Sequence, residues 1–313
     1  PSVYRFFAKR MSPIGNMKEV FTMFMVTLIC NPAQGAMDPM LVENLRSAWG
    51  GGPAKWLAVG EAVEFEVMQK PDTFEAVWDD VQNAGVDLVI LPTAGRCKRI
   101  LIADMDSTMI RQECIDELAD EAGVGARVAD ITARAMNGEL DFDAALNERV
   151  GLLAGLDAGI IDHVIEERIS LMPGGVELLL TMKSAGTYSA LVSGGFTAFT
   201  QRVADTLGFD ENRANTLIVE NGKLTGQVGD PILGKQAKVD ALNEISARLG
   251  LSTDDAIAVG DGANDLGMLT LAGTGVALHA KPAVQAQCDV RVNHGDLSAL
   301  LFVQGYSRAD FVT

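Results

Sequence analysis

The stretch RILIADMDSTMIRQE, residues 99–113, joins an apolar run to two aspartates. The unbroken apolar run 100–103 is typical of a strand that is buried on both faces of a parallel sheet. Side chains at positions i and i+2 of an extended chain point the same way, so Asp104 and Asp106 are expected to share one pocket. Because two neighbouring carboxylates repel each other, a proton or a cation must relieve the repulsion. The stretch predicts a metal or acid–base site, and the alternative is a solvated turn after a strand.

The composition limits the class of protein. With 313 residues, 48% of them hydrophobic and 21% charged, the chain resembles a soluble globular protein of about two domains. A net charge of −17 argues against nucleic-acid binding, which needs clustered Lys and Arg. No apolar run approaches the ~18 residues of a membrane span. The four cysteines lie far apart, which indicates neither a zinc site nor a disulfide framework and favours a reducing cytoplasm.

The first third of the chain is predicted to carry no chemistry. Residues 1–22 show little pattern and are interpreted as an N-terminal extension. Residues 23–94 are predicted to form a small α/β domain, in which no paired acids or cations stand out. Such a domain is expected to serve in binding or dimerisation rather than in catalysis. Its expected strands are residues 25–30, 63–68 and 87–91, and its expected helices are residues 38–49 and 73–84.

Residues 95–313 alternate apolar strands with amphipathic helices, which predicts an open, doubly wound α/β sheet of parallel strands. Between residues 112 and 172 apolar side chains recur at helical spacing, so a helical cap is expected directly after the two aspartates. Asn221-Gly222 predicts a hairpin within residues 215–228. The strands expected for the sheet are residues 100–103, 188–192, 256–259, 275–278 and 290–292.

Polar motifs follow three of these strands. They read DMDST at 104–108, SGG at 193–195 and GDGAND at 260–265. Ligands of doubly wound sheets bind at the carboxyl ends of the strands, so the three motifs are expected to share one site. Aspartates suit Mg²⁺, which prefers hard oxygen ligands, whereas the Ser193 hydroxyl and the Gly194 N–H can bind a phosphoryl group. The sequence therefore predicts a magnesium and phosphate pocket.

This order of motifs resembles that of the haloacid-dehalogenase superfamily of phosphotransferases, over about residues 97–295. DMDST looks like the first motif, SGG like the second and GDGAND like the fourth. The third motif is a lysine that precedes the last major strand. Lys238 has the spacing to Asp261 that is seen in the phosphoserine phosphatase branch, and Lys235 remains the alternative.

The resemblance implies four catalytic residues: Asp104, Asp106, Ser193 and Lys238. Asp104 would be the nucleophile that forms an aspartyl-phosphate, and Asp106 would be the proton donor and later the base. Ser193 and Lys238 would hold phosphoryl oxygens. The implied Mg²⁺ ligands are Asp104, the Asp106 carbonyl oxygen and Asp261, with Asp265 behind them.

The cap contributes the residues that would select the substrate. Glu113 and Arg149 match positions at which the phosphoserine phosphatase branch binds the substrate ammonium and carboxylate, respectively. The implied reaction is hydrolysis of O-phosphoserine in the last step of serine biosynthesis. The alternatives are another small phosphomonoester, or transfer of the phosphoryl group to an alcohol such as homoserine. The other implied substrate contacts are Ser193, Gly194, Met136, Phe142 and Asn264.

Residues 23–94 look like the amino-acid-binding ACT-type domains that are attached to some bacterial phosphoserine phosphatases. The resemblance rests on position and on a partial β-α-β-β-α-β order. It implies an amino-acid effector at the N-terminal domain, and a homodimer is the expected assembly.

Overall fold

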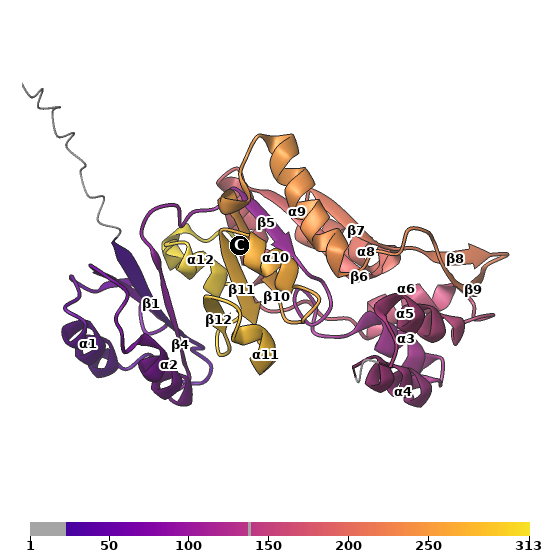
Figure 1. Ribbon diagram of the computed structural model, residues 1–313, viewed down its shortest axis with the longest axis horizontal. Helices are drawn as coiled ribbons and strands as arrows, with labels where there is room; N and C mark the ends of the chain where they lie inside the picture. Colours follow the sequence, from indigo (N-terminus) through magenta and orange to yellow (C-terminus); the bar gives the residue numbers. More distant parts are fainter. Residues whose placement is uncertain (1–22, 137–138) are drawn as a thin grey trace, which may run out of the picture.

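The computed structural model describes residues 23–136 and 139–313, which form two main sheets and a separate hairpin (Figure 1). The expected N-terminal extension, residues 1–22, lies outside the described residues. Within the described residues, no helix is both long enough and apolar enough to cross a membrane.

The N-terminal unit is an antiparallel sheet with strand order β2-β3-β1-β4 and two helices on one face (Figure 1). Asp38 starts the first helix because its carboxylate accepts the Met40 N–H at 2.8 Å. This β-α-β-β-α-β order is consistent with an ACT-like domain, whose effector and assembly stay predictions. The elements are β1 (Phe24–Cys30), α1 (Pro39–Ala48), β2 (Lys55–Ala58), β3 (Ala62–Val67), α2 (Phe74–Asn83) and β4 (Val86–Pro92).

The expected strands and helices of this unit are present to within about two residues, but β2 was not predicted. It is a four-residue edge strand that pairs only with β3, so its sequence KWLA has little alternation to reveal it.

The C-terminal unit is the expected doubly wound sheet, with parallel strands in the order β12-β11-β10-β5-β6-β7. Its central strand β5 is the apolar run that precedes the two aspartates, and all four of its residues are buried. The strands are β5 (Ile100–Ala103), β6 (Tyr188–Phe196), β7 (Glu211–Asn215), β10 (Ala256–Gly260), β11 (Thr274–Leu278) and β12 (Val290–Val292).

Helices cover both faces of this sheet. Ile100 and Ile102 of β5 pack in one core with α9 and α10, whereas Leu101 and Ala103 pack in another core with α7, α8 and α12. This alternation is the period of two that an extended strand requires. The helices are α7 (Gly175–Ser184), α8 (Thr197–Leu207), α9 (Lys235–Leu249), α10 (Leu266–Leu271), α11 (Pro282–Gln285) and α12 (Ala299–Val303).

Two details of the sheet differ from the sequence prediction. Strand β6 does not end at Val192 but continues through the SGG motif, because Phe196 still pairs with Asn215 after an irregularity. Strand β7 was not predicted, since its sequence ENRAN is polar and it lies at the edge of the sheet.

The cap is helical as predicted and lies at the opposite end of the molecule from the N-terminal unit (Figure 1). The hairpin of β8 (Leu217–Glu220) and β9 (Lys223–Val228) packs beside the cap, and the Gly155 N–H donates to the Leu224 carbonyl at 2.8 Å. The sequence predicted this hairpin but not its position beside the cap. The cap helices are α3 (Cys114–Glu121), α4 (Gly125–Met136), α5 (Phe142–Gly151) and α6 (Gly159–Glu167).

The N-terminal sheet packs directly on the C-terminal unit. Ile29 and Val89 belong to the same apolar core as Leu300 of α12. At the edge of this contact, Arg96 forms an ion pair with Glu64 at 2.9 Å and donates to the Val303 carbonyl at 3.1 Å. Both charged side chains are nearly buried, so the interface between the units combines a shared apolar core with an ion pair that is largely removed from water.

Candidate active site

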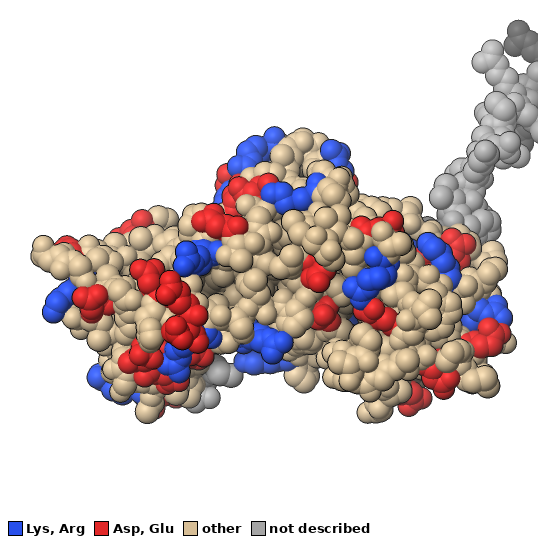
Figure 2. Space-filling view, turned by 180° about the vertical axis from the view of Figure 1, so that it is seen from behind, with Lys and Arg blue, Asp and Glu red and all other residues tan. Residues whose placement is uncertain are grey.

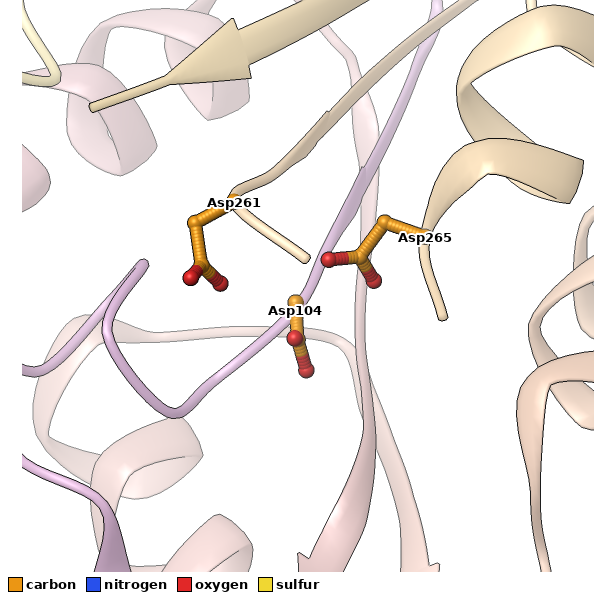
Figure 3. A group of neighbouring side chains, drawn as sticks. All are labelled: Asp104, Asp261 and Asp265. Carbon is orange, nitrogen blue, oxygen red and sulfur yellow. The ribbon is translucent and has the colours of Figure 1, made fainter. Parts of the chain in front are cut away.

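The carboxyl ends of β5, β6 and β10 meet at one edge of the sheet, as the register of the strands requires. Asp104 directly follows β5, and its N–H donates to the Val259 carbonyl of β10 at 3.0 Å. Asp261 follows β10, and Asp265 lies one turn further along the chain. Figure 3 shows the three side chains around one small region of the site, and each offers a carboxylate oxygen within 4.8 Å of the others.

Lys238 lies against this cluster. Its ammonium is 2.7 Å from Asp104 Oδ1 and 2.6 Å from Asp265 Oδ1, and only 2% of its side chain is exposed. Burial by itself would lower the pKa of Lys238, but the Asp104 and Asp265 carboxylates outweigh burial and raise it. Lys238 is therefore charged. Lys235, the alternative, is exposed at the first residue of α9.

The oxygens of the cluster suit a hard divalent cation. Both Asp265 oxygens are occupied, one by Lys238 and the other by the Gly262 N–H at 3.0 Å. Asp104 uses Oδ1 for Lys238 and for the Met105 N–H, and its Oδ2 accepts no hydrogen bond from any described residue. Three carboxylates against one ammonium leave negative charge, which an oxygen-liganded cation would neutralise. The site therefore fits a metal ion beside Asp104 and Asp261.

Asp106 lies on the cap side of Asp104. Its Oδ1 accepts the Cys114 N–H at 3.0 Å, and its Oδ2 accepts the Ser193 hydroxyl at 3.4 Å. Burial, helped by the Asp104 carboxylate, raises the pKa of Asp106 to about 6, although the contact with Cys114 lowers it. A carboxyl group with this pKa can both donate and accept a proton near neutral pH.

Ser193 is buried at the SGG motif, and its hydroxyl oxygen accepts the Gly195 N–H at 2.9 Å. Asn215, at the end of the neighbouring strand β7, holds the motif in place. Its side-chain NH₂ group donates to the Gly194 carbonyl at 2.9 Å, and its side-chain oxygen accepts the Leu233 N–H at 2.7 Å. The sequence analysis missed Asn215. Nothing in the polar segment ENRAN marks it, since both of its partners are distant along the chain.

Glu113 and Arg149 both lie in the cap. Glu113 directly precedes α3, and its carboxylate accepts the Ser107 hydroxyl at 2.7 Å. Burial, with a contribution from Asp106, raises the pKa of Glu113 to about 7. Arg149 is in the last turn of α5, where burial lowers its pKa while Asp116 and Glu113 oppose the change. The cap thus places the Glu113 carboxyl group close to Asp106, and the Arg149 guanidinium lies near Glu113 and Asp116.

The three remaining predicted contacts differ in position. Phe142 begins α5, and its ring packs over the SGG motif and over Gly234, so the cap contacts the site on the side of that motif. Asn264 is exposed. The side chain of Met136 lies outside the described residues, so its predicted contact stays a prediction.

Substitution of Gly194 by alanine should disturb this contact. The new Cβ would lie 3.2 Å from Phe142 Cζ, which is tighter than an ordinary contact, so the Phe142 ring would have to shift by a few tenths of an ångström. We expect kcat/KM of the Gly194→Ala variant to be about 3- to 10-fold below that of the wild type, since closing the cap over the site would then cost ~1 kcal/mol of strain. Steady-state kinetics measure the effect. The control is Gly151→Ala, because a Cβ there meets nothing within 4 Å, and a comparable loss in the control would contradict the steric explanation.

The fold and the site together define a capped α/β enzyme whose aspartates lie at the carboxyl ends of parallel strands. Residues 101–270 match the haloacid dehalogenase-like hydrolase family. The chain belongs to this family.

Several relatives of known name are similar to the chain. A phosphoserine phosphatase of Streptomyces coelicolor is 41% identical over 80% of this chain and 62% of its own length. A phosphoserine phosphatase of a Polaromonas species is 46% identical over 65% of this chain and 88% of its own length. The crystal structure of a probable phosphoserine phosphatase from Vibrio cholerae superimposes with a TM-score of 0.74 at 31% identity, covering 92% of this chain and 88% of that one. The chain spans less than two thirds of the length of several relatives, the Streptomyces protein included.

Proposed function

We propose that the chain hydrolyses O-phospho-L-serine to L-serine and phosphate, the final step of serine biosynthesis. The observation that carries the proposal is the Lys238 ammonium, which is held between Asp104 and Asp265 with Asp106 on the cap side. This arrangement suits transfer of a phosphoryl group, since a fixed cation lies beside a carboxylate with a free oxygen. The names of the similar proteins support the choice of substrate.

The metal of the proposal is Mg²⁺. Asp104, the Asp106 carbonyl oxygen and Asp261 would hold it, because Asp265 is already occupied by Lys238 and Gly262. When bound, the ion neutralises negative charge on the phosphate and on the carboxylate that approaches it.

Asp104 would attack phosphorus in line, forming a phosphorus–oxygen bond to its carboxylate while the bond to the serine oxygen breaks. The protonated Asp106 would give its proton to the leaving serine oxygen. It would then take a proton from the water that cleaves the aspartyl-phosphate, which returns Asp104 as a carboxylate. Ser193 and Lys238 would donate hydrogen bonds to the phosphoryl oxygens as their charge grows.

The cap would select an amino-acid phosphate. Glu113 would accept the substrate ammonium, and Arg149 would bind the substrate carboxylate with a guanidinium that suits two parallel hydrogen bonds. Phe142, Met136, Gly194 and Asn264 would complete the pocket. Positively charged side chains at the site are needed to hold an anionic substrate, because the chain carries a net charge of −17. Acidic side chains also gather on the cap, at the left of Figure 2. An anionic substrate must therefore be held by fixed groups against an unfavourable overall field.

Replacement of Arg149 by alanine should lower kcat/KM for O-phosphoserine by about 10- to 100-fold, the range for loss of a charged hydrogen bond. Hydrolysis of phosphoethanolamine, which lacks the carboxylate, should fall by less than about threefold, since the lost interaction is absent from that substrate. Steady-state kinetics on both compounds make the comparison. Arg127→Ala, at an exposed arginine of the same cap, is the control. Equal loss on the two substrates would remove the assignment of Arg149.

A screen of small phosphoesters with and without Mg²⁺ tests the function as a whole. O-phosphoserine is expected to be the best substrate, and chelation of the metal should abolish turnover until Mg²⁺ is restored. Phosphate release should not change when homoserine is added, because water and not an alcohol accepts the phosphoryl group. A phosphohomoserine product would instead establish transfer, and preference for another phosphoester would overturn the proposed substrate.

A further inference from the structure

Asp87 joins the N-terminal sheet to a loop of the C-terminal unit. We define this loop, residues 293–298, as the junction loop. Asp87 lies in β4 and is 0% exposed. Its carboxylate accepts three consecutive backbone N–H groups, from Asn293 at 2.8 Å, His294 at 3.1 Å and Gly295 at 2.8 Å. Successive N–H groups that point inward form a concave site for an anion, and here the anion is a side chain of the other unit.

The surroundings of Asp87 reinforce this connection. Gln82 of α2 accepts the Asn293 side-chain amide at 2.9 Å, and that amide also lies 3.1 Å from the Gln285 side chain of α11. Among the described residues, Asp87 forms no ion pair with Lys, Arg or His, so its carboxylate is stabilised by the three backbone N–H groups and by the Gln82 side-chain amide, which donates to it at 3.5 Å. A buried carboxylate of this kind is stable only while those donors stay in place. The position of the junction loop is therefore tied to β4.

The junction loop also contacts the return linker of the cap, by which we mean residues 169–174. The Leu297 N–H donates to the Pro173 carbonyl at 3.1 Å. Gly174 has a φ of +79°, and a Cβ there would lie 2.4 Å from Ser298 N and 2.5 Å from an Asp296 carboxylate oxygen. Such close packing leaves no room for the linker to shift unless the junction loop shifts with it.

The junction loop makes a third contact, with His279 at the sheet edge that carries the aspartates. The His279 ring is 2.8 Å from the Gly295 carbonyl, and the His279 N–H donates to the Val292 carbonyl at 2.8 Å. His279 directly follows β11, whose residue Ala277 pairs with Gly260 of β10. The junction loop thus contacts the N-terminal unit, the return linker of the cap and the strand next to Asp261.

We propose that Asp87 is a positioning residue, through which the N-terminal unit fixes the junction loop and thereby the return linker of the cap. Two crossings of the chain connect the cap to the sheet, and the bridge between Ile110 and Leu171 joins them. The β8–β9 hairpin supports the cap from another side, through contacts such as that of Gly155 with Leu224. The placement of one crossing consequently affects the placement of the whole cap over the aspartates. In this arrangement the N-terminal unit acts on catalysis without contributing a group to the site.

The test compares Asp87→Asn with Asp79→Asn in the full chain. Asp79 is an exposed aspartate of α2 in the same unit, so it matches the change in charge. Hydrogen–deuterium exchange should show lost protection in Asp87→Asn both at residues 293–298 and at residues 169–174, with no change in the control. kcat/KM for O-phosphoserine should fall by about 2- to 30-fold with a raised KM, because a misplaced cap weakens binding.

Two results would overturn the proposal. The first is faster exchange confined to residues 293–295, and the second is a lower kcat with unchanged KM, which indicates only fewer folded molecules. If Asp87→Asn does not fold, Gln82→Ala is the second variant, because it retains the Asp87 carboxylate. It should lose protection from exchange at residues 293–298 and 169–174 to a smaller extent than expected for Asp87→Asn. Normal exchange at residues 169–174 in Gln82→Ala would then overturn the proposal. The exchange measurement needs no substrate, so it tests the positioning role of Asp87 even if the proposed function is wrong.

Discussion

An Asp104→Asn variant should fold normally and release no phosphate from O-phosphoserine. The amide cannot form the phosphorus–oxygen bond, so turnover is expected to fall by about 10⁴-fold or more. Without divalent cations, the variant should melt at the same temperature as the wild type or higher, because the cluster then holds two mutually repelling carboxylates rather than three, and the Lys238 ammonium keeps its ion pair with Asp265. Phosphate release and thermal unfolding with and without Mg²⁺ measure both effects.

The matched control is Asp162→Asn, at an exposed aspartate of α6, which should keep both activity and melting temperature. Loss of activity in this control would indicate that overall charge matters. Retained turnover in Asp104→Asn with an intact fold would exclude Asp104 as the nucleophile.

A Lys238→Met variant should lose both activity and stability. Asp265 is 0% exposed, and removal of its cation leaves a buried carboxylate without a charged partner. Breaking a buried ion pair in this way destabilises a protein by about 3–5 kcal/mol, which is a large share of the free energy of unfolding. Urea unfolding of the metal-free protein measures the change. The double variant Lys238→Met with Asp265→Asn should recover part of the stability but none of the activity.

Lys235→Met is the control for this prediction, since Lys235 lies in the same helix but is exposed. Its free energy of unfolding should change by less than about 0.5 kcal/mol, as is usual for surface substitutions. Loss of turnover in Lys235→Met together with retained turnover in Lys238→Met would reverse the choice between the two lysines.

The parts of the fold that follow a local pattern could be predicted from the sequence. The apolar run of β5 has no polar interruption, and the cap helices repeat their apolar residues at helical spacing. Lys238 could also have been chosen from the pattern of α9, since it lies on the buried face with Ala241, Leu242 and Ile245. A lysine on the apolar face of a helix is rare enough to attract attention.

What the sequence did not reveal depends on partners that are distant along the chain. Asn215 and Asp87 are ordinary polar residues in their local segments, and only the folded chain places them against the SGG motif and the junction loop. The hairpin of β8 and β9 was predicted from Asn221-Gly222, but its place beside α5 depends on the whole sheet. Tertiary contacts of this kind leave no periodicity to detect.

The strand order of the C-terminal sheet has a consequence for synthesis of the chain. Strand β5 is central but emerges first, whereas its neighbour β10 emerges only after the cap, β6, β7 and the hairpin have been made. Pairing across such long separations is slow, so the nascent chain carries an exposed apolar β5 for much of its translation. The elements of the N-terminal unit are contiguous, and this unit can fold before the rest. It then offers the last-made segments, β12 and α12, a preformed surface on which to dock.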